Sequence, residues 1–535
     1  MPPLLRPSDE TRLYSERGDS RYIPNVILLI RQHRILFFTG MLGGLALRIV
    51  FFIHFPAVTD DSHIYADLAT NWLQHGVYGQ TVSGPPPSAD GQPDQPAQRQ
   101  IMPTAGRLPG YPAFLVLIFW LFGVGNFKAV MLTQILFDLA TCVIVADLAR
   151  RAVSERASEI AFLLATFCPF LANYSSAVLT ETLEVFFTAL ALDCALAASS
   201  RMREGWLSGG VTGLWAATGA AISACVLLRP DGGLLLAAVL IYLLYVAMST
   251  AKGASLPAEI RALFKQYPDN PQMPPAMKFV FWHNSGAALL IMLIVTAFAL
   301  APLVPWTVRN WHTLHRFQPL APRYANDADE LVPRGLNRWV KTWILDYASV
   351  EEIYWNVPGD KIDPRKLPSR ALENAPERDS TLALIADYNQ DQDLTPELDA
   401  RFDRLAEDRI HEHPSRYYLV LPMLRVTDMW LRPRTELLPV DPRWWTLNDE
   451  TKRSITAVGF GLLNLAYVCA ALLALIRKTP AIHGLVLLAG FVLLRSALLL
   501  TIESPEPRYT LECYPVVIIC AAACLAKINR AASKI

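Results

Sequence analysis

Two adjacent aspartates, Asp60 and Asp61, follow directly on a long apolar run of the sequence. A carboxylate in this position could take a proton from an attacking hydroxyl group. Adjacent carboxylates also raise each other's pKa, which would help one of them act as a base. The structural alternative is an aspartate that only caps the N-terminus of the following helix. The spacing alone leaves both interpretations open.

The segment after these aspartates predicts a short helix that lies along a membrane surface. Ile64, Leu68 and Trp72 recur every four residues and form one apolar face, while polar side chains form the opposite face. Gly76 is placed to end this helix, because glycine takes the left-handed conformation of a C-cap without steric cost. Such a helix would hold Asp61 at the boundary between lipid and water.

Other segments carry acids and arginines in short polar turns. Glu181 starts an apolar helix in "LTETLEVFF", Arg229 lies in the turn "LLRPDGG", and Arg508 with Tyr509 lies in "ESPEPRYTLE". Each also has an ordinary role, namely a favourable helix dipole for the acid and local ion pairs for the arginines. As a group they indicate phosphate recognition beside a carboxylate base, because guanidinium groups pair with phosphate oxygens through parallel hydrogen bonds.

Two further arginines stand beside or inside apolar runs. Arg309 follows such a run and is flanked by Trp306 and Trp311, so it could also be an interfacial anchor. Arg48 lies inside the first run, where a charge is costly unless it faces a partner or water. Both arginines are therefore candidates for the same polar site.

The composition predicts an all-α polytopic membrane protein. Of its 535 residues, 53% are hydrophobic and 18% are charged, whereas soluble proteins usually carry charge on about a quarter of their residues. The formal net charge of zero gives no indication of nucleic-acid binding. Several apolar runs are long enough to cross a bilayer as helices. We expect spans at residues 35–55, 127–148, 157–172, 182–198, 209–228, 233–248, 286–305, 455–476, 482–501 and 513–525.

Basic residues between the runs predict the orientation of the chain. Lysines and arginines gather in the first 34 residues, at residues 150–156, 201–203, 252–278 and 477–478, and at the C-terminus. By the positive-inside rule, both termini face the cytoplasm, and Asp61 lies on the outer face of the cytoplasmic (inner) membrane. The run 111–122 is short for a span, and counting it as one would move the basic cluster at Arg150 outside. We therefore expect this run to be interfacial or re-entrant.

The same runs divide the chain into four regions. Residues 1–34 form a cytoplasmic N-terminal segment, and residues 35–305 form a transmembrane module with a first outer loop at 54–126. Residues 306–454 form a large outer loop region, in which "SRYYLVLPMLRVTDMWL" predicts a helix on the membrane surface. Residues 455–535 form the last membrane helices and a cytoplasmic tail.

The order of these motifs resembles the GT-C superfamily of polytopic glycosyltransferases. Within it, the chain is most similar to the bacterial group related to protein O-mannosyltransferases and lipid A aminoarabinose transferases. Five motifs carry the resemblance, from about residue 48 to residue 515: "DDSHIYADLATNWLQHGVYG", "GRLPGYPAFLVLIFWLFG", "SSAVLTETLEVFF", "LLRPDGGLLL", and "PWTVRN" together with "PRYTLECYP".

The resemblance implies an overall fold and a type of reaction. The implied fold is a bundle of about 10–12 transmembrane helices with outer juxtamembrane helices and a mixed extracytoplasmic loop region. The implied enzyme inverts the sugar carbon as it moves a sugar from a polyprenyl-phosphate donor to a hydroxyl group. The acceptor would be an envelope glycan, a lipid or a protein at the outer membrane face.

The resemblance also implies roles for individual residues. The acid of the first outer loop is the base, and the D-x-x-x-Y spacing selects Asp61, with Tyr65 as its tyrosine. Ser62 departs from the commoner pattern of a second acid after the first, so Asp60 stays an alternative to Asp61. Candidate contacts to donor or acceptor are Arg309, Arg508 and Arg229 for the donor phosphate, and Glu181 and Arg107 for either substrate.

Metal dependence varies across the superfamily, so the resemblance implies no certain cofactor and leaves a divalent metal as an option. The sequence offers no cluster of metal ligands beyond the carboxylates. His411 and His413 form the motif "HEH", which we interpret as part of a solvated loop.

Two other classes of protein are alternatives to a transferase. A secondary transporter or flippase of a lipid-linked precursor would line a pathway near the bilayer midplane with charged residues and often has repeat symmetry. A non-catalytic scaffold would leave the clustered acids and arginines without a shared role. The predicted gathering of charges at one membrane face favours the transferase.

Overall fold

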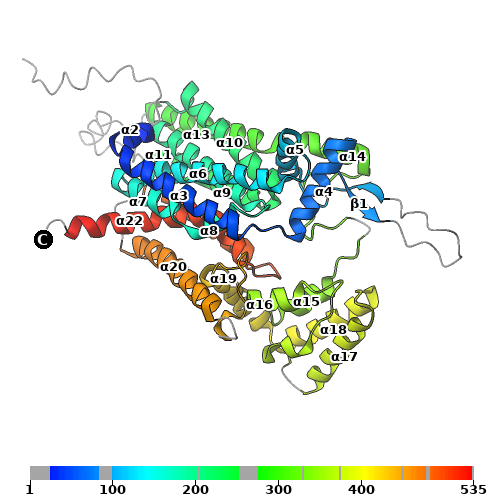
Figure 1. Cartoon of the computed structure of the whole chain (residues 1–535). Helices are drawn as coiled ribbons and strands as arrows, with labels where there is room; N and C mark the ends of the chain where they lie inside the picture. Colours follow the sequence, from blue (N-terminus) through cyan, green and yellow to red (C-terminus); the bar gives the residue numbers. More distant parts are fainter. Residues whose placement is uncertain are drawn as a thin grey trace, which may run out of the picture.

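The structure, a computed structural model, describes residues 25–83, 99–202, 205–251, 275–327, 330–372, 375–446, 451–477 and 482–532. Helices dominate these residues, and the sheet among them is a single antiparallel hairpin (Figure 1). Its strands are β1 (Gly79–Ser83) and β2 (Arg99–Pro103), and Gly79 lies opposite Pro103. The predicted all-α fold class is therefore confirmed.

Seven helices within the described residues are long and apolar enough to cross a membrane, which confirms a multi-pass membrane protein. An eighth span results if α13 (Pro275–Leu300) and α14 (Leu303–Leu314), which bend by 44°, are counted as one. The seven are α3 (Arg34–His54), α6 (Phe127–Ala152), α9 (Glu181–Arg201), α10 (Gly209–Leu228), α11 (Gly233–Ala251), α20 (Thr451–Ile476) and α22 (Tyr514–Ala532).

Three predicted apolar segments differ from a full span. The expected span at 157–172 is two helices, α7 (Glu155–Thr166) and α8 (Pro169–Tyr174), because a proline disfavours the helical conformation of the residue before it. The expected span at 482–501 is the 15-residue helix α21 (Leu485–Leu499), which is shorter than a full span. The run at 111–122 forms α5 (Gly110–Phe122), which has 13 residues and is as short as predicted.

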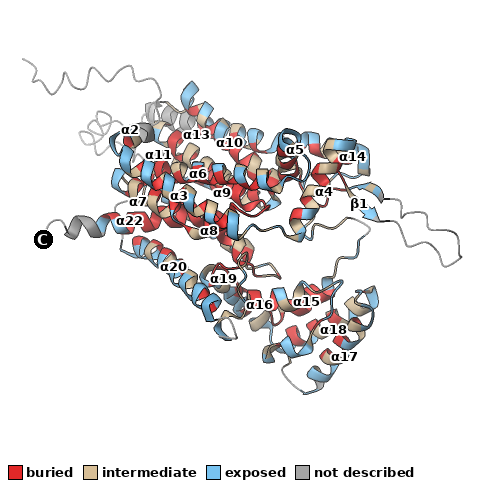
Figure 2. Cartoon of the chain, in the orientation of Figure 1, coloured by how far each residue is buried: buried red, intermediate tan, exposed pale blue. Residues whose placement is uncertain are grey.

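The bundle has a mainly apolar interior and an apolar outer surface. Helices α6, α9 and α22 lie inside it, where small residues such as Ala149, Ala195 and Ala522 allow close helix packing. Helix α20, at the edge of the bundle, exposes large apolar side chains such as Ile455 and Leu462 (Figure 2). An exposed apolar face of this length suits contact with lipid.

The region 306–454, which the sequence predicts to be an outer loop region, has a hydrophobic core of its own. Helices α15 (Arg334–Lys341), α17 (Ala375–Asp391) and α18 (Pro396–Glu412) enclose Trp339, Trp343 and Phe402. Helix α19 (Leu421–Leu431) joins this region to α20 and exposes Met423 and Leu424. The remaining short segments are α2 (Asn25–Gln32), α16 (Tyr347–Ser349), η2 (Pro230–Gly232), η3 (Val350–Tyr354), η4 (Pro364–Lys366), η5 (Ser369–Ala371), η6 (Arg416–Val420), η7 (Trp444–Thr446) and η8 (Pro507–Cys513).

A buried ion pair joins α3 to α6 inside the bundle. Arg48 donates through Nε to Oδ2 of Asp138 at 2.6 Å, and through Nη1 to the carbonyl oxygens of Gly44 and Thr166. Both side chains are almost fully buried. Arg48 thus has the partner that a charge inside a span requires. The structure does not bring it to Asp61, so we withdraw its assignment as a substrate contact.

This ion pair gives a first prediction. Asp138→Ala should lower the free energy of unfolding by roughly 3–5 kcal/mol, because it leaves the charge of Arg48 buried and unpaired. Replacing both residues, as Arg48→Met with Asp138→Leu, should restore most of that loss. Thermal unfolding of the purified protein in detergent measures both effects. An Asp138→Ala variant as stable as the wild type would contradict this account.

Candidate active site

Helix α4 (Asp60–His75) carries the two aspartates at its start, but neither of them caps it. The N-cap is Thr59, whose backbone N–H donates to the hydroxyl oxygen of Ser62 at 2.9 Å in a capping box. The interpretation of Asp61 as a helix cap is therefore wrong. Gly76 ends the helix in the left-handed conformation, with φ of 68°, as predicted.

A short backbone pairing fixes the position of this helix start. The N–H of Ala57 donates to the carbonyl oxygen of Ser176 at 2.9 Å, and the N–H of Val178 donates to that of Ala57 at 3.1 Å. The segment that enters α4 is thus tied to the segment that enters α9. This pairing brings Asp61 beside Glu181, the first residue of α9.

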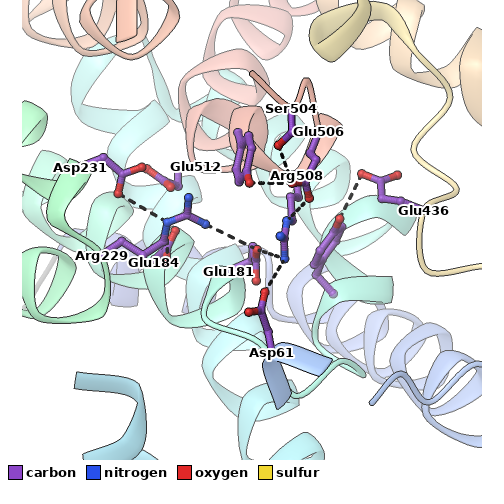
Figure 3. Close-up of polar contacts among 12 residues, drawn as sticks. Asp61, Glu181, Glu184, Arg229, Asp231, Glu436, Ser504, Glu506, Arg508 and Glu512 are labelled. Carbon is purple, nitrogen blue, oxygen red and sulfur yellow. Dashed lines mark hydrogen bonds and ion pairs between the residues drawn. The ribbon is translucent and has the colours of Figure 1, made fainter. Parts of the chain in front are cut away.

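Asp61 lies between two arginines. Its Oδ1 is 3.3 Å from Nη2 of Arg107. Its Oδ2 is 3.5 Å from Nη1 of Arg508, a contact that Figure 3 shows. Burial alone would raise the pKa of Asp61, but the charges of Arg508 and Arg107 outweigh burial and lower this pKa below its ordinary value. The expectation of a raised pKa was wrong, because the exposed Asp60 affects Asp61 less than the arginines do.

Arg508, in η8, is the central cation of the site. Its guanidinium lies 3.6 Å from Glu181 and 2.6 Å from Glu506, in addition to its contact with Asp61. The hydroxyl of Tyr509 donates to the same Glu506 at 2.7 Å. Arg508 therefore joins carboxylates from α4, α9 and the loop before η8.

A second set of charges lies next to the first. Arg229 is 3.8 Å from Glu181, 3.7 Å from Glu184 and 3.5 Å from Asp231, and it stacks on the ring of Tyr509. Arg495 of α21, fully buried, pairs with Asp231 and lies 2.8 Å from Glu512. We call the whole group the outer polar cluster: Asp61, Arg107, Glu181, Glu184, Arg229, Asp231, Arg495, Glu506, Arg508, Tyr509 and Glu512.

Sequence reasoning missed Arg495, Glu184 and Glu512. Arg495 stands inside the apolar run 482–501, which is the same signal that identified Arg48. Glu184 lies one turn after Glu181 on the same helix face, where i and i+3 side chains are neighbours. Both positions were therefore open to prediction.

Two carboxylate oxygens of the outer polar cluster can still accept hydrogen bonds. Oε2 of Glu181 and Oδ1 of Asp231 are buried and accept no hydrogen bond from the described residues. Buried polar atoms in proteins normally have a partner, so these atoms invite one. A ligand that carries hydroxyl groups could supply the missing donors.

The other predicted site residues lie apart from these contacts. Arg309, in α14, donates to the carbonyl oxygens of Tyr78 and Thr104 and stacks on Trp306, so it anchors the hairpin to α14. Tyr65 is buried beneath Asp61, and its ring packs edge-on against Tyr111. Neither residue makes a direct contact with Asp61 among the interactions of the described residues.

The described residues contain no group of three or more His, Cys, Asp or Glu side chains arranged to hold a metal ion. In the outer polar cluster, arginines occupy the positions next to Asp61 that a cation would take. His411 is largely exposed at the end of α18 and contacts Glu407 at 3.0 Å. We therefore derive no chemical step through a metal ion.

Known solved structures resemble this chain weakly. AglB, the oligosaccharyltransferase from Archaeoglobus fulgidus, in complex with an inhibitory peptide and a dolichol-phosphate, is 13% identical with a TM-score of 0.48. The match covers 94% of this chain, which spans about half (52%) of the length of AglB. ArnT from Cupriavidus metallidurans bound to undecaprenyl phosphate is 14% identical with a TM-score of 0.36, over 94% of this chain and 79% of ArnT. Another structure of the archaeal enzyme contains Zn and sulfate. At these scores the likeness gives no information about activity.

A family model is the more specific finding. No curated protein matches the chain. Residues 103–257, which include Arg107, Glu181 and Arg229, match the model of the family described as dolichyl-phosphate-mannose-protein mannosyltransferase. This match confirms the resemblance of the chain to membrane glycosyltransferases of the GT-C superfamily. It supports glycosyl transfer as the class of reaction.

Proposed function

We propose that this protein is an inverting glycosyltransferase with Asp61 as its base. The donor is a sugar linked to a polyprenyl phosphate, and the acceptor is a hydroxyl group at the outer face of the cytoplasmic membrane. Both chain termini lie in the cytoplasm. The observation that carries the proposal is the carboxylate of Asp61 within 3.5 Å of two arginines, Arg107 and Arg508.

The proposed reaction uses these groups in one displacement. Asp61 takes the proton of the acceptor hydroxyl, whose oxygen forms a bond to the anomeric carbon. The bond between that carbon and the phosphate oxygen breaks, and its electron pair leaves with the phosphate. Arg508 and Arg107 neutralise the charge that develops on the phosphate. Attack from the side opposite the leaving group inverts the sugar carbon.

Donor binding and the basicity of Asp61 are coupled in this proposal. The two arginines that lower the pKa of Asp61 are also the groups that would contact the phosphate. A phosphate that draws them away would return the pKa of Asp61 toward its ordinary value. The carboxylate would thus become a stronger base when the donor is in place.

An apolar cavity near α4 supports a lipid-linked donor. It has a volume of about 610 Å³ and lies between the C-terminal end of α4, α5 and α14. Its walls include Trp72, Pro109, Leu227 and Trp306, and Arg309 also lines it. A cavity with this lining can hold the apolar chain of the donor. The phosphate of the donor would then lie at the N-terminal end of α4, near Asp61.

Asp61→Asn should reduce sugar transfer by roughly 10²–10⁴-fold, because the amide cannot accept the hydroxyl proton. Binding of a polyprenyl-phosphate sugar should persist, since both arginines stay. Transfer by the purified protein in detergent or nanodiscs measures the first effect, and titration of the donor measures the second. Asp60→Asn is the matched control and should keep its activity. Full activity in Asp61→Asn would remove Asp61 as the base.

Arg508→Ala should weaken donor binding by roughly ten- to hundred-fold, because it removes a cation from a partly buried site. Arg508→Lys keeps the charge and should bind with intermediate affinity, since lysine lacks the paired donors. Arg365→Ala, at a fully exposed arginine, is the control. Arg309→Ala should matter less, because Arg309 already donates to two backbone carbonyls. A larger loss in Arg309→Ala than in Arg508→Ala would refute this phosphate site.

The lowered pKa of Asp61 predicts how its ion pairs depend on pH. A depressed carboxyl pKa contributes stability above the unfolded-state value of about 3.9, and that stability is lost as pH falls through the folded-state value. The difference in melting temperature between wild type and Asp61→Asn should therefore be constant from about pH 5 to 8 and change only below about pH 4. A change already at pH 6 would show that the arginines do not control Asp61.

A further inference from the structure

A second cavity, of about 340 Å³, lies against α19 in the outer loop region. None of its lining residues belongs to the outer polar cluster. The residues that matter for its chemistry are Leu424, Asp428, Leu431, Arg432, Trp444 and Trp445.

The polar side of this cavity is preformed. Oδ2 of Asp428 accepts a hydrogen bond from the backbone N–H of Tyr347 at 3.2 Å, and Oδ1 lies 3.7 Å from Arg432. The guanidinium of Arg432 is buried, stacks on the rings of Tyr347 and Trp445, and donates to the carbonyl oxygen of Pro442. Burial raises the pKa of Asp428 to about 6, although Arg432 opposes that shift, so Asp428 is mainly a carboxylate at pH 7.

The aromatic side of the cavity is held in place and has an unused donor. Arg443, next to Trp444, lies 2.6 Å from Glu352 and donates to the carbonyl oxygen of Lys366 at 2.7 Å. The indole N–H of Trp444 is buried and meets no acceptor among the described residues. Trp445 is 50% exposed, so part of its ring is open to a ligand.

These groups limit the chemistry of a ligand. An acyl chain would match the leucines but would leave the Trp444 N–H unpaired and would give Asp428 no donor beyond Tyr347 and Arg432, which is costly for a buried polar donor. A phosphate would be repelled by Asp428. A pyranose has C–H faces that pack on indole rings, hydroxyl groups that donate to a carboxylate, and oxygens that accept from an indole N–H.

We propose that this cavity binds one sugar unit of a glycan acceptor, as a subsite separate from the reacting hydroxyl. The proposal rests on the proposed function, because it names the acceptor class of that enzyme. Asp428 would accept from the sugar hydroxyls, Trp444 would donate to a ring or hydroxyl oxygen, and Trp445 would pack on the C–H face.

The cavity is connected to the outer polar cluster through α19. In η8, which carries Arg508 and Tyr509, the hydroxyl of Thr510 donates to the carbonyl oxygen of Met429 at 3.3 Å. Met429 is the neighbour of Asp428 in α19. The backbone of Tyr347 also holds Asp428, and the ring of Tyr347 lies under Arg432.

Saturation-transfer NMR on the full-length protein in nanodiscs tests the subsite. The probes are methyl pyranosides and short oligosaccharides of hexoses. Trp444→Phe keeps an aromatic ring and removes the N–H, and Asp428→Asn removes the charge. Each should weaken sugar binding by about ten-fold, as expected when one buried hydrogen-bond partner is lost. The controls are Trp120→Phe and Asp360→Asn, which change exposed residues that do not line the cavity. Both variants should bind sugars as the wild type does.

The outcomes separate this proposal from the proposed function. Asp61→Asn should bind the sugars normally although it transfers none, because binding does not need the base. Binding that depends on Trp444 without any transfer activity in the wild type would overturn the proposed function and leave the subsite intact. The subsite is overturned if no sugar gives saturation transfer, or if Trp444→Phe and Asp428→Asn bind as well as the controls. Quenching of tryptophan fluorescence by brominated lipids that is reduced in Trp444→Phe would assign the cavity to an acyl chain and would also overturn the subsite.

Discussion

Charge at one end of a helix bundle must be compensated by other protein charges, and in this protein the compensation depends on Arg508. Its guanidinium lies within 3.6 Å of Asp61, Glu181 and Glu506, which come from three different parts of the chain. Since removing one member of a buried pair leaves the other uncompensated, these residues hold one another in place. The geometry of the candidate site and the packing of α4, α9 and η8 are therefore parts of the same constraint.

Backbone hydrogen bonds also fix the position of α4 relative to α9. The pairing of Ala57 with Ser176 and Val178 ties the entry of α4 to the entry of α9 before any side chain contributes. The capping box of Thr59 and Ser62 then sets the direction of α4, which leaves Asp61 free to face the arginines. A second layer, Arg495 with Asp231 and Glu512, supports Arg229 in the same way. Groups held this firmly lose little entropy when a substrate arrives.

Much of this arrangement could be predicted from the sequence, because hydropathy and local spacing report it directly. The apolar runs predicted the membrane helices. The recurrence of Ile64, Leu68 and Trp72 every four residues predicted α4, and Gly76 predicted where it ends. The resemblance to known motifs selected Asp61, Glu181, Arg229 and Arg508, which the structure brings together. The direction of the pKa shift at Asp61 was predicted wrongly, because neighbours in sequence were considered and neighbours in space decide it. Arg48 and Arg309 could not be placed for a similar reason, since their partners are an aspartate 90 residues away and backbone carbonyls.

The distribution of unused hydrogen-bond acceptors explains why the site favours a transferase over a passive scaffold. A structural salt-bridge network tends to satisfy all of its buried polar atoms, because each unpaired one costs stability. Here Glu181 and Asp231 retain buried oxygens that accept no hydrogen bond from the described residues, close to an arginine, Arg229, that can hold an anion. A ligand that brings a phosphate and several hydroxyl groups would satisfy both sets at once. A sugar phosphate ester has this combination of groups, and its reacting carbon would lie between them, next to Asp61.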